Sequence, residues 1–169
     1  MTKALKFLHV LLASLALGSS LPASAGDSEQ NNPDSVMQIP LRDLLHNRSI
    51  RLEDIPGEVI LLSFFEPNCS WCHRQMKAFK KIQEQCDDTL QPVVVGINGN
   101  AQQLKKEVRR AKISYPALQA NRSLLQYTGE IPATPWTLLL NRQGDTLATL
   151  RGYIPLEDYL NVFAEQCQA

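Results

Sequence analysis

The sequence predicts one α/β domain in which a central mixed β-sheet is covered by helices on both faces. Apolar runs at 59–65 and 92–97 have the length and the β-branched content of strands that are buried on both sides. A segment with helical spacing follows each run, and a strand-strand-helix pattern closes the chain. A chain of 169 residues, 44% hydrophobic and 20% charged, supplies one core and hardly two.

Residues 1–25 differ from the rest and predict a secretory signal peptide. Lys3 and Lys6 precede an apolar stretch, and small residues offer a cleavage point after Ala25. The apolar stretch, 7–17, is shorter than the roughly 20 residues that span a bilayer, which disfavours the alternative of an uncleaved membrane anchor. We therefore expect an exported protein, and the bacterial character of the signal indicates the periplasm.

The polar segment 26–35 predicts a flexible lead-in, because it lacks large apolar side chains, and the domain is then expected over 36–169. Loss of the signal peptide removes two lysines and no acid, so 17 basic and 17 acidic residues become 15 and 17. This near-balance gives no reason to expect nucleic acid as a partner.

The first half of the domain is expected to alternate between strands and helices. Ahead of the first apolar run, we expect a short helix at 41–46 and a short strand at 50–52. Behind that run, the apolar positions of 69–86 recur every three to four residues, which predicts an amphipathic helix. A charged helix over 101–112 is expected after the second buried strand.

The second half is expected to form a hairpin and a last helix. Residues 136–140 and 146–150 predict two antiparallel strands, because the short connection between them contains Gly144. Pro155 at a first helical position, with acidic residues behind it, opens a helix that reaches about Cys167.

Redox chemistry is expected at the sequence Cys69-Ser70-Trp71-Cys72, where a buried strand ends and a helix begins. Unpaired N–H groups and the dipole at a helix N-terminus stabilise a thiolate and lower the pKa of its thiol. Cys69 is therefore the expected nucleophile. Cys72 lies within the first turn on the same side and is the expected resolving thiol, so the two form a redox-active disulfide.

Four segments together resemble the thioredoxin superfamily, specifically its exported TlpA/ResA-like branch, over about residues 50–165. They are LEDIPGEVILLSFF at 52–65, CSWC at 69–72, ISYP at 113–116 and ATPWTLLLNRQG at 133–144. The resemblance implies a thioredoxin fold and thiol–disulfide exchange with other proteins, and we expect neither a cofactor nor a metal. It also implies a cis peptide bond between Thr134 and Pro135, beside the dithiol, where backbone is presented to a substrate chain.

Two departures from the family affect the expected mechanism. Ser70 and Trp71 place no basic side chain between the cysteines and so offer no extra charge to stabilise the thiolate. Thioredoxins carry a buried Asp on the strand before the motif, and this chain has Ser63 there. Glu66 could substitute for that acid, the alternative being an exposed loop carboxylate. His73 lies one helical turn after Cys69 and could stabilise the thiolate when protonated, the alternative being a solvent-facing helix residue.

Three other functions fit parts of the same pattern. The run Cys69–His73 also matches the C-x-x-C-H pattern for covalent haem attachment, although a buried strand leads directly into it. A copper carrier would use thiolates with histidine, but only His46 and His73 follow the signal peptide. A scaffold protein could hold the two cysteines as a structural disulfide, which would resist mild reductant.

The remaining cysteines and aromatic residues support two further expectations. Cys86 and Cys167 end helices that would cover the same face of the sheet, so a disulfide between them is reasonable. The alternative is two reduced or separately buried thiols. Trp71, Trp136 and Phe65 are expected to form an apolar rim where a partner chain docks, unless Phe65 belongs to the core.

The expected function is that of a periplasmic thiol–disulfide oxidoreductase, with reduction of its clients favoured over oxidation by the resemblance. Cys69 and Cys72 would carry the reaction, and Thr134, Pro135 and Trp71 would contact the substrate. The expected partners are exported proteins with thiols or disulfides, and a membrane protein that supplies electrons.

Overall fold

The computed structural model describes residues 35–86, 89–165 and 167. The expected signal peptide, 1–25, and most of the expected lead-in lie outside these residues. The elements in chain order are η1 (Val36–Gln38), β1 (Leu41–Asp43), β2 (Ser49–Ile50), η2 (Leu52–Asp54), β3 (Val59–Phe65), α1 (Ser70–Gln85), β4 (Leu90–Gly96), α2 (Ala101–Ala111), β5 (Ala117–Gln119), α3 (Arg122–Thr128), β6 (Trp136–Leu140), β7 (Thr146–Arg151) and α4 (Leu156–Val162).

The centre of the domain is a seven-stranded mixed sheet in the order β2-β1-β5-β4-β3-β6-β7. Strand β3 lies between β4, which runs parallel to it, and β6, which runs antiparallel. Its side chains alternate between the two faces, with Leu61 and Phe65 in one apolar cluster and Ile60 and Phe64 in the other. Both faces of the central strand are therefore buried, as its continuous apolar sequence predicts.

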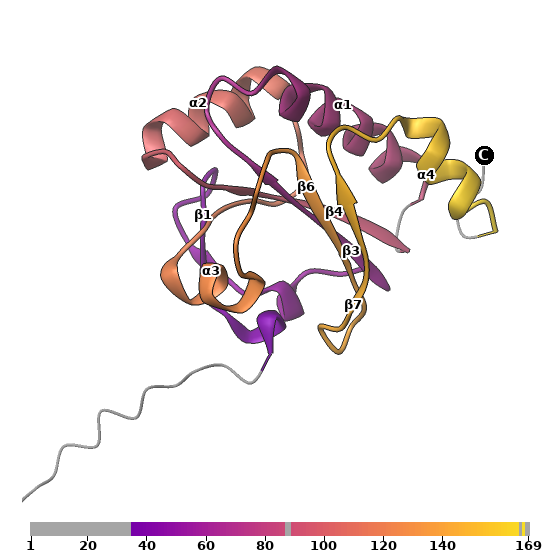
Figure 1. Ribbon diagram of the computed structural model, residues 1–169, viewed down its shortest axis with the longest axis horizontal. Coiled ribbons are helices and arrows are strands. Elements are labelled where there is room, and N and C mark those ends of the chain that lie inside the picture. Colours follow the sequence, from indigo (N-terminus) through magenta and orange to yellow (C-terminus); the bar gives the residue numbers. More distant parts are fainter. Residues whose placement is uncertain (1–34, 87–88, 166, 168–169) are drawn as a thin grey trace, which may run out of the picture. The chain divides into compact units, whose positions relative to one another are not determined.

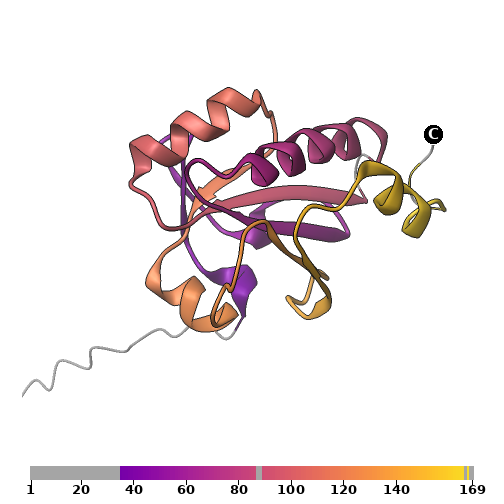
Figure 2. The ribbon, with the colours of Figure 1, turned by 45° about the horizontal axis from the view of Figure 1, so that its top comes forward.

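Helices cover both faces of this sheet, which confirms the predicted fold class. Figure 1 shows α1 and α2 on one side and α3 on the opposite side, and Figure 2 shows α1 and α2 lying side by side. The cluster under α1 and α2 also includes Tyr159 of α4. The opposite cluster includes Leu124 of α3 together with residues of η1 and η2.

Helix α1 is held against the sheet along one side. Its buried residues include Met76, Phe79 and Ile82, at the spacing of a single helix face. The Tyr115 hydroxyl donates a hydrogen bond of 2.9 Å to the Met76 carbonyl, and the ring of Tyr159 packs edge-on against Phe79. These contacts fix the position of the helix N-terminus, which begins directly after Cys69.

The C-terminal end of α1 is linked covalently to the end of the chain. Cys86 and Cys167 form a disulfide across a sequence separation of 81, and both are buried. Only the first of the two lies at a helix end, because α4 stops at Val162, well before the expected limit near Cys167. Pro155 is the N-cap of α4 and not its first helical residue.

The structure corrects the expectations for the N-terminal part of the domain and adds two elements. Residues 41–46 are strand β1 and a turn instead of a helix, because the backbone of β1 pairs with both β2 and β5. The strand expected at 50–52 is β2, followed at once by the 3-10 helix η2. Strand β5 and helix α3 have no counterpart among the expected elements.

Candidate active site at the dithiol

Cys69 and Cys72 are joined by a disulfide at the N-terminus of α1, with Cα atoms 5.2 Å apart. Cys69 is the N-cap residue, and its Sγ accepts the backbone N–H of Cys72 at 3.1 Å. Cys69 is half-buried, whereas Cys72 is 2% exposed. The first sulfur is therefore within reach of a partner, and the second is covered by the helix and the sheet.

The loop before β6 lies against the exposed sulfur. The Thr134–Pro135 peptide bond is cis. The Cys69 Sγ lies 3.7 Å from the Thr134 carbonyl oxygen and 3.6 Å from the Thr134 hydroxyl. The Pro135 carbonyl accepts a hydrogen bond from the Gly152 N–H at 2.9 Å, so this loop is fastened to the end of β7.

Glu66 joins this arrangement through Thr134 and is not the exposed loop carboxylate of the alternative expectation. Its Oε1 accepts the Thr134 hydroxyl at 2.8 Å, and its Oε2 accepts the Asn98 side-chain amide at 3.1 Å. A hydroxyl donates its one proton to one acceptor at a time. In this oxidised state the shorter contact assigns that proton to Glu66, and the Cys69 sulfur faces the Thr134 oxygen.

A narrow crevice lies behind the dithiol and leaves no room for a water molecule. Three titratable side chains line it beside the two cysteines, namely Glu66, His73 and Glu107. The Nδ1 atom of His73 is buried without a hydrogen-bond partner. Burial lowers the pKa of His73, and the nearby charges of Lys77 and Arg110 lower it further. His73 is thus neutral at pH 7 and lies beside the cysteines in a form that accepts a proton.

Glu107 has no counterpart among the expected site residues. It is 7% exposed on α2, where Leu104, Val108 and Ala111 are also buried. The spacing of these positions places residue 107 on the inward side of a helix. An acid at an inward position is unusual, and this is the sequence signal that could have pointed to Glu107 as a site residue.

Ser63 takes part in a buried hydrogen-bond network on the α1 side of β3. Its Oγ accepts the Thr137 hydroxyl at 2.9 Å, and both residues are buried. Farther along, the Gln75 amide donates to the Tyr159 hydroxyl at 3.5 Å and its Oε1 accepts the Ile154 N–H at 2.9 Å. Burial raises the pKa of Tyr159, so its hydroxyl stays protonated at any physiological pH. These hydrogen bonds join only neutral groups, and the acidic side chains near the dithiol, Glu66 and Glu107, take no part in them.

Of the three residues expected to form the apolar rim, only Trp71 does so. Trp71 is 52% exposed and stacks on Tyr153, with ring centroids 5.9 Å apart. Phe65, by contrast, is 1% exposed and belongs to the core. Trp136 is partly buried in the cluster on the opposite face of the sheet. The exposed aromatic surface beside the dithiol is therefore formed by Trp71 and Tyr153.

Within 35–86, 89–165 and 167, no group of three or more His, Cys, Asp or Glu side chains is arranged to hold a metal ion. Over the same residues, the helices are all too short or too polar to cross a membrane.

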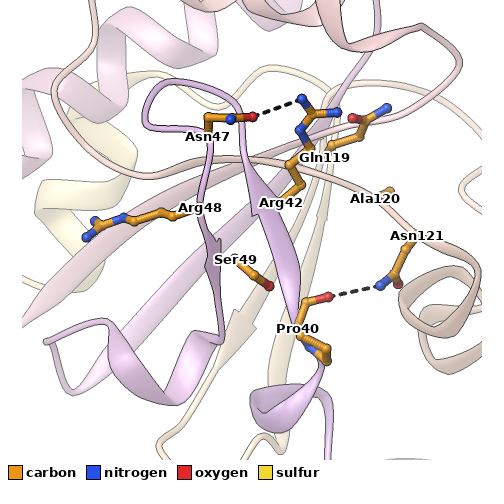
Figure 3. A pocket seen from close by; sticks show the side chains of 8 residues that line it. All are labelled: Pro40, Arg42, Asn47, Arg48, Ser49, Gln119, Ala120 and Asn121. Atoms are coloured by element: carbon orange, nitrogen blue, oxygen red, sulfur yellow. Dashed lines mark hydrogen bonds between the residues drawn. The ribbon is translucent and has the colours of Figure 1, made fainter.

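A separate hollow of about 410 Å³ lies over β1, its turn to β2 and the end of β5 (Figure 3). Two of its polar side chains are already paired within the chain. The guanidinium of Arg42 donates to Asn47 at 3.0 Å, and the Asn121 amide donates to the Pro40 carbonyl at 3.0 Å. The lining contains no cysteine, so the dithiol remains the centre of reactive chemistry.

A mixed sheet with a buried strand leading into a helix-capping CxxC disulfide, beside a cis-proline loop, defines the thioredoxin-fold class of thiol–disulfide oxidoreductases. The chain belongs to the thioredoxin-like domain family, whose model matches residues 51–166. This result confirms the expected superfamily. A search of curated proteins found no match.

Solved structures with the same fold include several named as thiol–disulfide proteins. A secreted disulfide oxidoreductase of Mycobacterium tuberculosis, described as homologous to E. coli DsbE, is 12% identical, with a TM-score of 0.64 over 79% of this chain and 99% of that one. StoA from Bacillus subtilis is 19% identical, with a TM-score of 0.60 over 73% and 93%. A thiol:disulfide interchange protein from Bacteroides sp. is 23% identical, with a TM-score of 0.62 over 78% and 88%. At these identities the similarity shows a shared fold.

Proposed function

We propose that this protein is a thiol–disulfide oxidoreductase that exchanges disulfides with other proteins through Cys69 and Cys72. The observation that carries the proposal is the position of Cys69 as N-cap of α1, half-buried, with its sulfur already accepting the backbone N–H of Cys72. The same N–H and the dipole of a 16-residue helix stabilise a negative charge on that sulfur after reduction. Cys69 is then the nucleophile.

In the reductive direction, the Cys69 thiolate attacks one sulfur of a client disulfide. The client S–S bond breaks, its second sulfur leaves as a thiolate that takes up a proton, and a mixed disulfide joins client and enzyme. The buried Cys72 thiol loses its proton and attacks the Cys69 sulfur, which releases the client's other thiolate. Two electrons have passed to the client, and the Cys69–Cys72 disulfide seen in the structure is regenerated.

Proton transfer in this scheme is assigned to the crevice behind the dithiol, because residue 63 is a serine. Neutral His73 lines the crevice beside Cys72 and has an unpartnered ring nitrogen, so we assign it as the acceptor of the Cys72 proton. This assignment replaces the expectation that a protonated His73 stabilises the thiolate.

Glu66 is proposed to tune Cys69 through Thr134. In the disulfide state the Thr134 hydroxyl donates to Glu66, at 2.8 Å, and not to the sulfur. A Cys69 thiolate competes with Glu66 for that proton, and the carboxylate also opposes a second negative charge nearby. Glu66 therefore favours the oxidised form of the dithiol.

The substrate chain is proposed to pass over Thr134, Pro135 and Trp71. The backbone of Thr134 lies beside the attacked sulfur, and Trp71 with Tyr153 offers an exposed aromatic surface next to it. A substrate cysteine that reaches Cys69 must pass between these two features.

The proposed location is the periplasm, with reduction as the direction of exchange. Support for the location comes from the signal-peptide pattern of residues 1–25 and from a similar fold whose description calls it secreted. In an oxidising compartment a reductase needs a supply of electrons, so a membrane protein is proposed as the donor, and exported proteins with disulfides are the clients.

The decisive experiment is trapping with Cys72→Ser in the full chain. The variant is expected to accumulate mixed disulfides on Cys69, because the resolving thiol is missing. The matched control is Cys69→Ser, which leaves only the buried sulfur and should trap nothing. Equal labelling of both variants, or of neither, would contradict the assignment of Cys69 as nucleophile.

A redox titration separates the oxidoreductase from a scaffold and tests the direction. Mild reductant is expected to open Cys69–Cys72 before the buried Cys86–Cys167 bond, whereas a scaffold would retain both. Equilibration with glutathione then gives the potential of the dithiol. A value near about −120 mV, typical of strong oxidants, would exclude a reductase.

A further inference from the structure

A hollow of about 460 Å³ lies next to the dithiol, between the first half of α1 and the end of α2. It begins at the active-site motif, since Ser70 is part of its lining. Every side chain of the lining that carries a full charge is positive. The lining residues are Asn68, Ser70, His73, Arg74, Lys77 and Arg110.

These positive charges are largely free to meet a ligand. Arg110 is 67% exposed and meets Glu107 only at 3.8 Å. Among the described residues, Arg74 and Lys77 form no ion pair with an acid, and the Arg74 guanidinium lies 4.5 Å from the centre of the Trp71 ring. Such a concentration stands out in a chain with equal numbers of basic and acidic residues.

Two further observations indicate a positive potential in this hollow. The N-terminus of α1, which opens into it at Ser70, adds the positive end of a 16-residue helix dipole. The pKa of His73 is lowered by burial and also by the charges of Lys77 and Arg110, which therefore act on the same space from two helices. A neighbouring acid, Glu107, opposes this effect only in part.

We propose that this cationic hollow binds acidic residues that flank the target cysteine of a protein client. The proposal rests on the thiol–disulfide exchange proposed above and specifies its substrate class. Ser70 and Lys77 are seven helical positions apart, which corresponds to about 10 Å along α1. An extended client segment covers that distance with about three residues, whereas a single small anion would reach only part of it.

Charge complementarity between the cationic hollow and an acidic client would raise the rate at which the two associate. Complementary charges beside a reactive group raise the association rate, and added salt weakens the effect. We therefore expect kcat/KM for acidic clients to exceed that for neutral ones by about tenfold at low ionic strength. The preference should disappear near 1 M salt, where the Debye length is about 3 Å.

The test uses three short peptides with the same intramolecular disulfide, flanked by Glu, Gln or Lys, and a small uncharged disulfide as a fourth substrate. The variant Lys77→Glu/Arg110→Glu reverses the sign of two of the three charges that line the hollow. The control Arg109→Glu/Arg122→Glu makes the same change in net charge at two exposed positions outside it. Each protein is assayed by kcat/KM at low and high salt.

The wild type should prefer the Glu peptide, and the reversed variant should prefer the Lys peptide. Each kcat/KM is divided by that of the same protein for the uncharged disulfide, so that any effect of the two substitutions on His73 cancels. A gain for the Lys peptide cannot come from a misfolded variant. An unchanged order of peptides in the reversed variant would overturn the proposal.

A binding measurement distinguishes failure of this proposal from failure of the proposed function. The oxidised protein is titrated with serine versions of the peptides, which bind without any exchange. If the wild type binds the Glu version and the reversed variant does not, the hollow is an acidic-segment site whether or not the dithiol is active. If the disulfide peptides are reduced but the serine versions bind equally, the function stands and the proposed site does not.

Discussion

Removal of the Cys86–Cys167 disulfide is expected to destabilise the domain strongly without impairing the dithiol. The change is Cys86→Ala together with Cys167→Ala, at two positions that are 1% and 6% exposed. The bond closes a loop with a sequence separation of 81. On the chain-entropy relation, a loop of this size contributes about 4.5 kcal/mol to the free energy of unfolding.

The position of the bond explains why activity should survive. Cys86 lies at the far end of α1 from Cys69, and a helix of 16 residues is about 24 Å long. The contacts that position the helix N-terminus, such as the bond from Tyr115 to the Met76 carbonyl, remain in the variant. The disulfide therefore secures the C-terminal part of the chain and not the reactive sulfur.

Equilibrium denaturation in urea, followed by far-UV circular dichroism, gives the free energy of unfolding, and kcat/KM at low temperature gives the activity. The control Cys69→Ala/Cys72→Ala removes a bond with a sequence separation of only 3, for which the same relation gives about 1.6 kcal/mol. A loss below that of the control, or a loss of activity under conditions where the variant is folded, would refute the reasoning.

Three other changes test the remaining interactions. Glu66→Gln should shift the pH midpoint of Cys69 alkylation downward, because it removes a nearby negative charge and frees the Thr134 hydroxyl for the thiolate. The control is Glu58→Gln, at the opposite end of β3, which should leave the midpoint in place. Asp43→Asn should cost about 1–3 kcal/mol of unfolding free energy at pH 7. Burial alone would raise the pKa of Asp43, but hydrogen bonds from the His46 ring and the N–H groups of Leu45 and His46 outweigh it and hold the pKa below 3.8. The stabilisation by the ionised Asp43 is thus complete above pH 3.8 and is lost as the pH falls through the lower pKa of the folded state. Urea denaturation at a series of pH values should therefore show the unfolding free energies of variant and wild type converging in acid. A difference that stays constant with pH would exclude the ionised carboxylate as the source of the stabilisation. Gly96→Ala should cost about 1–3 kcal/mol of unfolding free energy, because the new Cβ would lie 2.6 Å from Cδ2 of the fully buried Leu104. Leu104→Ala in the same chain should recover part of that loss. Strictly additive losses in the double variant would show that this contact is not the cause.

The site differs from the family pattern in how acidity is distributed around the dithiol. Thioredoxins place an acid on the central strand, whereas here that position is Ser63, bonded to Thr137 in a neutral network. The titratable groups gather instead on the α2 side of the dithiol, where Glu66, His73 and Glu107 line one crevice. The serine at position 63 is thus accompanied by titratable groups elsewhere around the dithiol.

Local sequence was sufficient to predict an element that makes its own backbone hydrogen bonds, as a helix does, or that is buried on both faces. Residues 59–65 and 69–86 were placed within one residue of β3 and α1, because a continuous apolar run and a helical repeat are local signals. Residues 41–46 were assigned wrongly, because a three-residue strand is decided by its partners, and β1 finds one of them in β5, far along the chain. The short β5 was missed for the same reason.

The sequence by itself determined the fold class, the family resemblance and the two reactive cysteines, since spacing along the chain specifies a dithiol at a helix start. Only the tertiary structure decided what surrounds that dithiol. Glu66 meets Thr134 across 68 positions, and Arg110 approaches Lys77 from a different helix. Such pairs depend on how the sheet brings distant loops and helices together, and the spacing of residues along the chain does not show which of them meet.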